Sequence, residues 1–214
     1  MLINRLGLIS HATVQTFEMV FIAAFFAVLF GLPLGVLLFV TRNPHLFKKP
    51  MMHSALGLVV NVLRSIPFII LLVAITPLTR LIVGTSIGTT AAMVPLAISA
   101  IPFFARLVES AISEVPMGLI EAALAMGATV LQTVRKVLIP EARSTIVRAI
   151  TLTLITLVGY SAMAGAIGGG GLGNVAIMYG YERFDIQIMI VTVLILIAMV
   201  QCFQWLGDWI ARTV

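Results

Sequence analysis

The sequence predicts an all-helical integral membrane protein with five transmembrane helices. Of its 214 residues, 61% are hydrophobic and only 10% are charged, and the mean hydropathy is +1.16. Soluble domains are closer to half apolar and a quarter charged. Because a helix needs roughly 20 apolar residues to cross a bilayer, the chain has room for several spans but not for a soluble domain of normal size. We therefore expect one transmembrane domain over residues 1–214, with its core at about 12–210.

Five segments are long and apolar enough to cross a membrane. They lie at approximately 13–40, 53–79, 86–110, 145–167 and 185–210. The first follows a short polar start and has no small-residue cleavage site after it, so we interpret it as a retained helix rather than a removed signal peptide. Pro67, Pro95 and Pro102 are expected to kink the helices that contain them.

Positive charges are divided unequally between the two ends of these spans. One end carries Arg42, Lys48, Lys49, Arg106, Arg135, Lys136, Arg143, Arg148 and Arg212, and the other carries Arg5, Arg80 and Arg183. Because Lys and Arg mark the cytoplasmic side, the bias predicts an N-terminus outside and a C-terminus in the cytoplasm. The net charge of +5 thus indicates orientation rather than nucleic-acid binding, which needs a basic stripe on one solvated face.

Other functional classes find little support. The three histidines (His11, His45 and His53) have no partner at ligand spacing, so we expect no metal site, and Cys202 lies in an aliphatic run typical of an inert thiol. The carboxylates are dispersed, which argues against a membrane-embedded enzyme. A self-sufficient secondary transporter remains an alternative, although no internal repeat is visible.

The predicted cytoplasmic loop, about 111–144, has the pattern of two short helices around a tight turn. Pro116 suits a first helical turn, Gly127 suits a helix end, and Thr129 with Gln132 has the form of a capping box. Pro140 is expected to end the second helix. Apolar residues follow one stripe at helical spacing: Ile120, Leu124, Leu131, Val134 and Leu138. This stripe either packs onto the chain's own helices or docks into a groove on a partner.

The same loop carries a family resemblance. Glu121-Ala122-Ala123, Gly127 and Val137-Leu138-Ile139-Pro140 keep the spacing of the "EAA…G…I-x-L-P" loop of ABC importer permeases, which the chain resembles. The stretches "RSIPFIILL" (64–72), "VGTSIG" (83–88) and "LVGYSAMAGAIGGGGLG" (157–173) are similar to the methionine-importing branch. The resemblance implies the type I importer fold in a bacterial inner membrane, with methionine as substrate; another amino acid or a small anion is the alternative.

The resemblance also implies partners. These are a second copy of the chain, two copies of a separate ABC ATPase that binds and hydrolyses the ATP, and an extracytoplasmic substrate-binding lipoprotein. The chain would be neither an enzyme nor the holder of a cofactor. The residues that would couple it to the ATPase are Glu121, Ala122, Ala123, Gly127 and Pro140. Small alanines permit close approach and Gly127 permits reversal of the chain, whereas Glu121 has the alternative role of capping a helix N-terminus.

A glycine-rich run, Gly168-Gly169-Gly170-Gly171-Leu172-Gly173, matches G-x-G-x-x-G but lacks the strand and helix of a nucleotide fold. The chain has no G-x-x-x-x-G-K-[ST] motif either, so energy must come from another subunit. We interpret the run as flexible backbone on the outer face, near the place where a substrate-delivering protein would dock.

Substrate-pathway candidates are Arg64 inside the second span and Tyr160, Ser161 and Met163 in the fourth. An ionisable residue within a membrane span is energetically costly, so a functional role is the first hypothesis for it. Three roles stay open for Arg64: a salt bridge with Glu18, snorkelling to cytoplasmic water, or a place in the pathway. Ordinary helix packing is the alternative for the fourth span.

Overall fold

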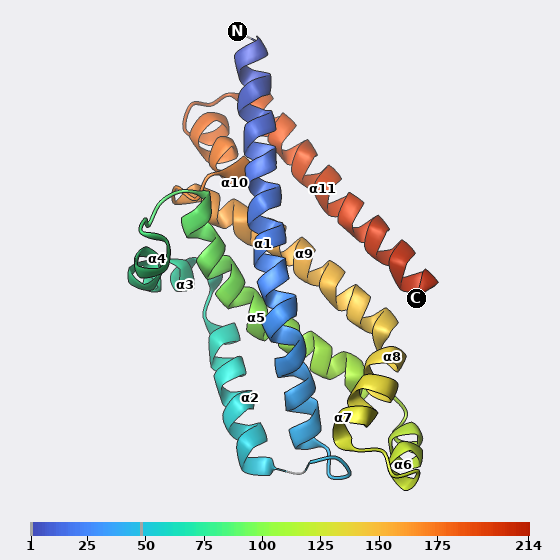
Figure 1. Cartoon of the computed structure of the whole chain (residues 1–214). Coiled ribbons are helices and arrows are strands. Elements are labelled where there is room, and N and C mark those ends of the chain that lie inside the picture. The colour runs from blue at the N-terminus through green and yellow to red at the C-terminus, as the bar shows by residue number, and fades with distance from the viewer. Residues whose placement is uncertain (1, 48) are drawn as a thin grey trace.

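The structure is a computed structural model that describes residues 2–47 and 49–214, with side chains from residue 5 onward. Four long helices, α1 (Leu2–Arg42), α5 (Thr89–Ser113), α9 (Arg143–Ala166) and α11 (Ile186–Thr213), cross one another at an angle (Figure 1). The shorter elements are α2 (Pro50–Ser65), α3 (Phe68–Ala74), α4 (Thr76–Val83), α6 (Met117–Ala125), α7 (Val130–Thr133), the π-helix η1 (Val134–Leu138), α8 (Ile139–Glu141), α10 (Gly171–Val175) and the π-helix η2 (Ala176–Tyr181).

Four of the five predicted spans are single helices in the structure, and the first of them is longer at both ends than expected. The second is not. The predicted continuous helix over 53–79 is wrong, because α2 and α3 meet at an angle of 99°. Ile66, at φ −80° and ψ 122°, is extended, as the residue before a proline prefers. Pro67 therefore breaks its span instead of kinking it, whereas Pro95 and Pro102 lie within α5.

The centre of the bundle is the crossing of α1 over α5. Gly31 and Gly35 make the crossing close: a β-carbon on Gly31 would lie 2.9 Å from the carbonyl oxygen of Ile101, and one on Gly35 would collide with the Ala105 carbonyl. Small residues at such contacts are what membrane helices use to pack backbones together. Beside the crossing, Phe104 and Leu96 of α5 are fully buried, so α5 is the packing axis of the fold.

The two ends of the bundle are distinct. The N-terminus and α10 lie at one end, and α6 with the start of α2 lies at the other (Figure 1). Arg5 is ion-paired with Asp185, which directly precedes α11, at 3.0 Å. At the opposite end of α11, the Ser144 hydroxyl donates a hydrogen bond of 2.8 Å to the Ala211 carbonyl. Adjacent loops thus alternate between ends, as the five-span prediction requires.

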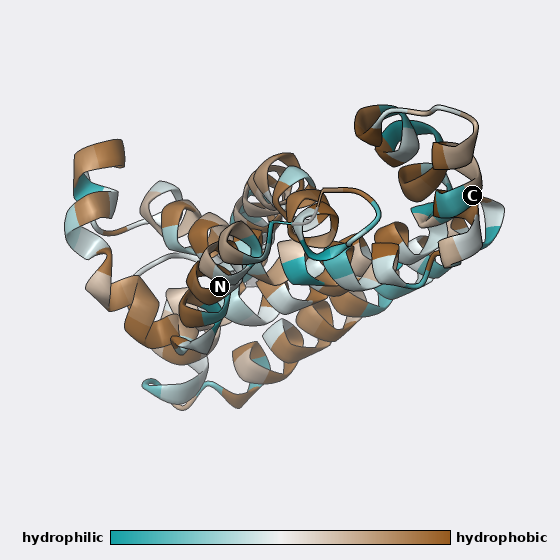
Figure 2. Cartoon of the chain, turned by 90° about the horizontal axis from the view of Figure 1, so that it is seen from below, coloured by the Kyte–Doolittle hydropathy of each residue, from teal (hydrophilic) through white to brown (hydrophobic). Residues whose placement is uncertain are grey.

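Hydrophobic residues predominate along the long helices (Figure 2), and many of their side chains are exposed. Exposed side chains there include Phe21, Phe25, Phe30, Leu194 and Ile197. A water-soluble monomer rarely exposes so large a continuous apolar surface. Lipid, or another membrane subunit, is the environment that this surface requires.

Candidate functional site: the coupling segment and the transport pathway

The coupling segment, residues 111–144, begins where α5 ends and α6 follows. α6 closes with a Schellman motif: the Gly127 N–H donates to the Leu124 carbonyl at 2.9 Å, and the Ala128 N–H donates to the Ala123 carbonyl at 3.0 Å. Gly127 has a φ of +83°, a value that glycine adopts without the steric cost of a β-carbon. The predicted helix end at Gly127 is confirmed.

The predicted capping box is also confirmed. The Gln132 N–H donates to the Thr129 hydroxyl oxygen at 3.3 Å, and the Thr129 N–H donates to the Gln132 side-chain oxygen at 2.8 Å. These reciprocal bonds satisfy two N–H groups that a helix start leaves without partners. They fix the direction in which the chain leaves the turn.

The second helix ends at Glu141, one residue after Pro140, so the predicted helix end is confirmed to within one residue. The helical run continues through α7, η1 and α8 to Glu141, with Pro140 in the first turn of α8. In an α-helix the proline ring would clash with the carbonyl four residues earlier. The π-turn immediately before it, in which the Ile139 N–H donates to the Val134 carbonyl, widens the helix and accounts for the tolerance of Pro140.

The apolar stripe of the segment is divided between two environments. Ile120, Val134 and Leu138 are buried against the chain's own core, whereas Leu131 is 59% exposed. In α6 and the turn after it, Met117, Leu119 and Met126 are also exposed, Met126 by 83%. Packing onto the chain's own helices thus explains the buried part of the stripe and leaves a separate apolar surface uncovered at the tip.

Of the residues that the resemblance assigns to ATPase coupling, three lie in α6, Gly127 follows it and Pro140 lies in α8. Glu121, Ala122, Gly127 and Pro140 are exposed and Ala123 is buried. The small size of Ala123 therefore serves packing within the chain. Glu121 lies past the first turn of α6, so it does not cap this helix; one of its carboxylate oxygens is 3.9 Å from Nε2 of His45 in the loop after α1.

The glycine-rich run is not flexible surface backbone, so this interpretation is wrong. Gly169, Gly171 and Gly173 are buried. The Gly171 N–H donates to the Gln15 side-chain oxygen and the Leu172 N–H donates to the Thr16 hydroxyl, both at 2.9 Å. The run is a tightly packed turn held by α1, and the positive φ angles of Gly168, Gly170 and Gly171 explain its composition.

The pathway candidates are not gathered into one site. Tyr160 stacks on Phe68, the first residue after the break in the second span, and Met163 is 47% exposed. Ser161 is buried, and its hydroxyl donates to the Val158 carbonyl at 2.8 Å. In this conformation Ser161 therefore contributes to helix packing and does not face a pathway.

Arg64 lies at the end of α2, exposed, with its guanidinium carbon 5.9 Å from the centre of the Phe103 ring. Glu18 is exposed on α1. Among the residues that the structure describes, the two form no ion pair with each other. The salt-bridge role considered for Arg64 is absent within the single chain.

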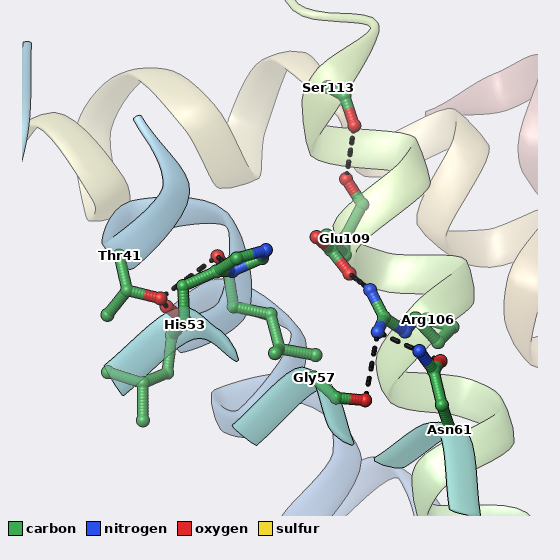
Figure 3. A network of polar contacts seen from close by, with 9 residues as sticks. Thr41, His53, Gly57, Asn61, Arg106, Glu109 and Ser113 are labelled. Carbon is green, nitrogen blue, oxygen red and sulfur yellow. Dashed lines mark hydrogen bonds and ion pairs between the residues drawn. The ribbon is translucent and has the colours of Figure 1, made fainter. Parts of the chain in front are cut away.

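A partly buried polar network was not predicted from the sequence, where Arg106 served only as a marker of the cytoplasmic side. Arg106 pairs with Glu109 at 2.6 Å and also donates to the Asn61 side-chain oxygen at 2.9 Å and the Gly57 carbonyl at 3.3 Å (Figure 3). Glu109 is only 4% exposed. The network ties α2 to α5, and an arginine three residues before a glutamate on a helix was the available signal.

A second polar contact ties α2 to α1. Nδ1 of His53 lies 3.1 Å from the Leu38 carbonyl oxygen, which also accepts a hydrogen bond from the Thr41 hydroxyl (Figure 3). α2, the helix before the break, is thus held by polar contacts to both α5 and α1. Elsewhere in the described part of the chain, no group of three His, Cys, Asp or Glu side chains is arranged to hold a metal ion.

Comparison with known proteins gives a consistent result. A probable D-methionine transport system permease protein, MetI, of Vibrio cholerae is 58% identical over 207 residues, 97% of this chain and 92% of the relative. The D-methionine transport system permease protein MetI of Escherichia coli K12 is 57% identical over 151 residues, 71% of this chain and 70% of the relative.

The chain also matches solved structures of ABC transporters. A chain of the MetNI methionine ABC transporter in an inward-facing conformation matches with a TM-score of 0.96 at 50% identity, covering 97% of this chain and 96% of that one. An amino acid ABC transporter matches at 23% identity with a TM-score of 0.81, which supports the fold alone. The predicted importer permease fold is confirmed. Residues 28–214 match the family model for inner membrane components of binding-protein-dependent transport systems, and the chain belongs to that family.

Proposed function

We propose that the chain is the permease subunit of a methionine importer driven by ATP hydrolysis on a separate subunit. The observation that carries the proposal is the agreement in fold, at a TM-score of 0.96 and 50% identity, with the MetNI methionine ABC transporter over nearly the whole length of both chains. The 58% identity to a probable D-methionine permease supports the same substrate class. Another amino acid or a small anion is the alternative substrate.

The proposed assembly has two copies of the chain and two ATPase chains, with an extracytoplasmic binding lipoprotein that delivers the substrate. The N-terminus faces outward and the coupling segment faces the cytoplasm, in line with the charge bias. ATP binds to the ATPase, because this chain has no G-x-x-x-x-G-K-[ST] motif. The exposed residues Met117, Leu119 and Met126 offer an apolar surface on α6 and the turn after it, which suits a groove on that ATPase.

The coupling segment is connected to the membrane helices in a way that suits force transmission. α6 follows α5 after a three-residue link that ends in Pro116, and α8 leads into α9 through the single residue Ala142. Closure of the two ATPase chains would bring the two coupling segments together and move α5 and α9 as levers. The pathway would then open outward, and hydrolysis would return it to the inward-facing state that the similar MetNI structure represents.

Transport in proteoliposomes tests this function. The chain is co-reconstituted with its ATPase and binding protein, and uptake of radiolabelled L- and D-methionine is measured with and without ATP and with other amino acids as competitors. We expect uptake that requires ATP, the ATPase and the binding protein. Uptake by the chain alone would instead indicate a secondary transporter, and competition by a different amino acid alone would change the substrate.

A further inference from the structure

A long groove lies between the second half of α1 and the coupling segment. It has a volume of about 580 Å³. Its lining residues are Leu32, Pro33, Val36, Leu37, Val40, Phe47, Val130, Leu131, Val134, Arg135 and Ile139. We call it the inner-end groove. Apart from Arg135, every lining side chain is a hydrocarbon, so the walls offer an occupant almost no side-chain hydrogen bonds.

The length and position of the groove suit one leaflet of a bilayer. Its α1 wall runs from Leu32 to Val40, which at 1.5 Å per residue is about 12 Å. One leaflet contributes about half of the roughly 30 Å hydrocarbon core. α1 ends at Arg42, two residues after the last α1 residue of the wall, and the wall continues with Phe47 in the following loop. The groove therefore opens at the level where a membrane gives way to water.

Two cations flank the mouth. Arg135 lines the groove directly, and Nζ of Lys49 lies 4.6 Å from the centre of the Phe47 ring, another lining residue. Within the described part of the chain, neither Arg135 nor Lys49 forms an ion pair. The mouth of the groove is thus positively charged and has no carboxylate of its own to balance it.

We propose that the inner-end groove binds an anionic phospholipid, with one acyl chain along α1 and the phosphate between Arg135 and Lys49. An acyl chain needs no hydrogen bonds, whereas an extended peptide would leave its backbone polar groups unsatisfied between these apolar walls. Arg135 in η1 and Lys49 in the loop before α2 have no ion-pair partner in the described part of the chain, and two such cations favour an anionic headgroup over a zwitterionic one. The bound lipid fills the space between α1 and η1, and so supports the coupling segment from its membrane side.

Lipid retention measured by native mass spectrometry tests the proposal. The permease, purified in complex with its ATPase, is titrated with dioleoyl phosphatidylglycerol or with dioleoyl phosphatidylcholine in detergent. We expect one phosphatidylglycerol per permease copy to bind more tightly than phosphatidylcholine. The variant Lys49→Gln/Arg135→Gln should lose about fivefold in phosphatidylglycerol affinity for each cation removed, with phosphatidylcholine binding unchanged.

Two further variants distinguish lipid binding in the groove from non-specific attraction of anionic lipid to a basic protein. Arg80→Gln/Arg183→Gln removes the same charge from exposed positions outside the groove and should leave phosphatidylglycerol affinity unchanged. Leu37→Trp places a large ring on a lining position that is 40% exposed, and should reduce binding of both lipids. Size-exclusion profiles and co-purification of the ATPase verify that each variant is assembled.

The proposal is overturned by three results. Equal affinity for the two lipids would show that the cations do not select the headgroup. Equal losses in the groove variant and the Arg80→Gln/Arg183→Gln control would show only non-specific attraction. Unchanged binding in Leu37→Trp, in a protein that assembles normally, would place the lipid elsewhere.

Discussion

The rings of Phe68 and Tyr160 are stacked with their centres 4.5 Å apart and their planes within 1° of parallel. Phe68 is the first residue of α3, directly after the break in the second span, and Tyr160 lies in the C-terminal half of α9. The stack therefore joins the broken span to the helix that carries the candidate pathway residues. α9 begins at the end of the coupling segment. The stack therefore lies on the helix that connects the coupling segment to the candidate pathway residues.

Substitutions of Tyr160 separate packing from substrate contact. Tyr160→Ala removes the stack, which we expect to lower stability by about 0.5–1.5 kcal/mol beyond the loss of buried area and to reduce methionine uptake. Tyr160→Phe keeps the ring and removes only the hydroxyl. If the hydroxyl contacts substrate, Tyr160→Phe raises KM for methionine while the thermal unfolding midpoint is unchanged; an unchanged KM would assign Tyr160 to packing.

The second prediction concerns the Arg106–Glu109 pair, in which Glu109 is buried and Arg106 is partly exposed beside α2, the first half of the broken span. Removing one partner of a fully buried pair leaves an uncompensated charge and costs about 3–5 kcal/mol. Because the Arg106 side chain is 21% exposed, we expect a smaller cost here. We expect Glu109→Ala and Arg106→Ala each to lower the unfolding midpoint of the detergent-solubilised protein. Arg106→Met/Glu109→Leu should be less damaging than either single change.

A double-mutant cycle with Glu109→Ala and Arg106→Ala measures this coupling. Independent, additive losses would contradict the importance of the pair. Arg148→Ala is a suitable control, since Arg148 is an exposed cation near the same end of the bundle that forms no ion pair in the described part of the chain. Its removal should change the midpoint little.

Local sequence signals predicted local structure well in this chain. Thr129 and Gln132 are three residues apart, and Gly127 is two residues after the last residue of α6, so the forces that set these features act within a single turn. The long spans were predictable for a similar reason, because apolar length alone specifies a membrane helix. Their number was predicted correctly only by counting the broken pair α2 and α3 as one span.

The errors fall where distant residues decide the outcome. Nothing near Pro67 distinguishes it from Pro95 or Pro102, yet only Pro67 breaks its helix, since the neighbouring helices determine whether a bent or an interrupted span packs better. The glycine-rich run looked flexible because its partner Gln15 is 156 positions away in the sequence. Burial of Glu109 likewise depends on α2 lying across α5, which spacing along one helix does not reveal.

Gly127 yields a third prediction, about assembly with the ATPase. A β-carbon at Gly127 would meet nothing within 4 Å, so the cost of Gly127→Asp is the strain of a positive φ, about 1 kcal/mol. The permease should still insert and purify. Because the turn lies among the exposed tip residues, we expect the variant to lose co-purification of the ATPase.

Gly84 is the matched control for Gly127. It also ends a helix in the left-handed region, at φ +80°, and a β-carbon there would likewise meet nothing within 4 Å, but it follows α4 instead of α6. Gly84→Asp should therefore impose similar backbone strain and keep the ATPase bound. Loss of the ATPase in both variants would attribute the effect to strain alone, and retention in both would remove Gly127 from the coupling surface.

A fourth prediction concerns the glycine-rich turn, where close packing replaces the flexibility first expected. A β-carbon on Gly173 would collide with the backbone of Ala162 in α9, and overpacking of this kind costs about 1–3 kcal/mol. We expect Gly173→Ala to lower the unfolding midpoint and to reduce uptake, because α10 would be displaced from α9. Gly159→Ala, on the same helix as Ala162 but with nothing within 4 Å, should be tolerated. A normal midpoint for Gly173→Ala would mean that the turn yields easily and that its glycines serve mobility after all.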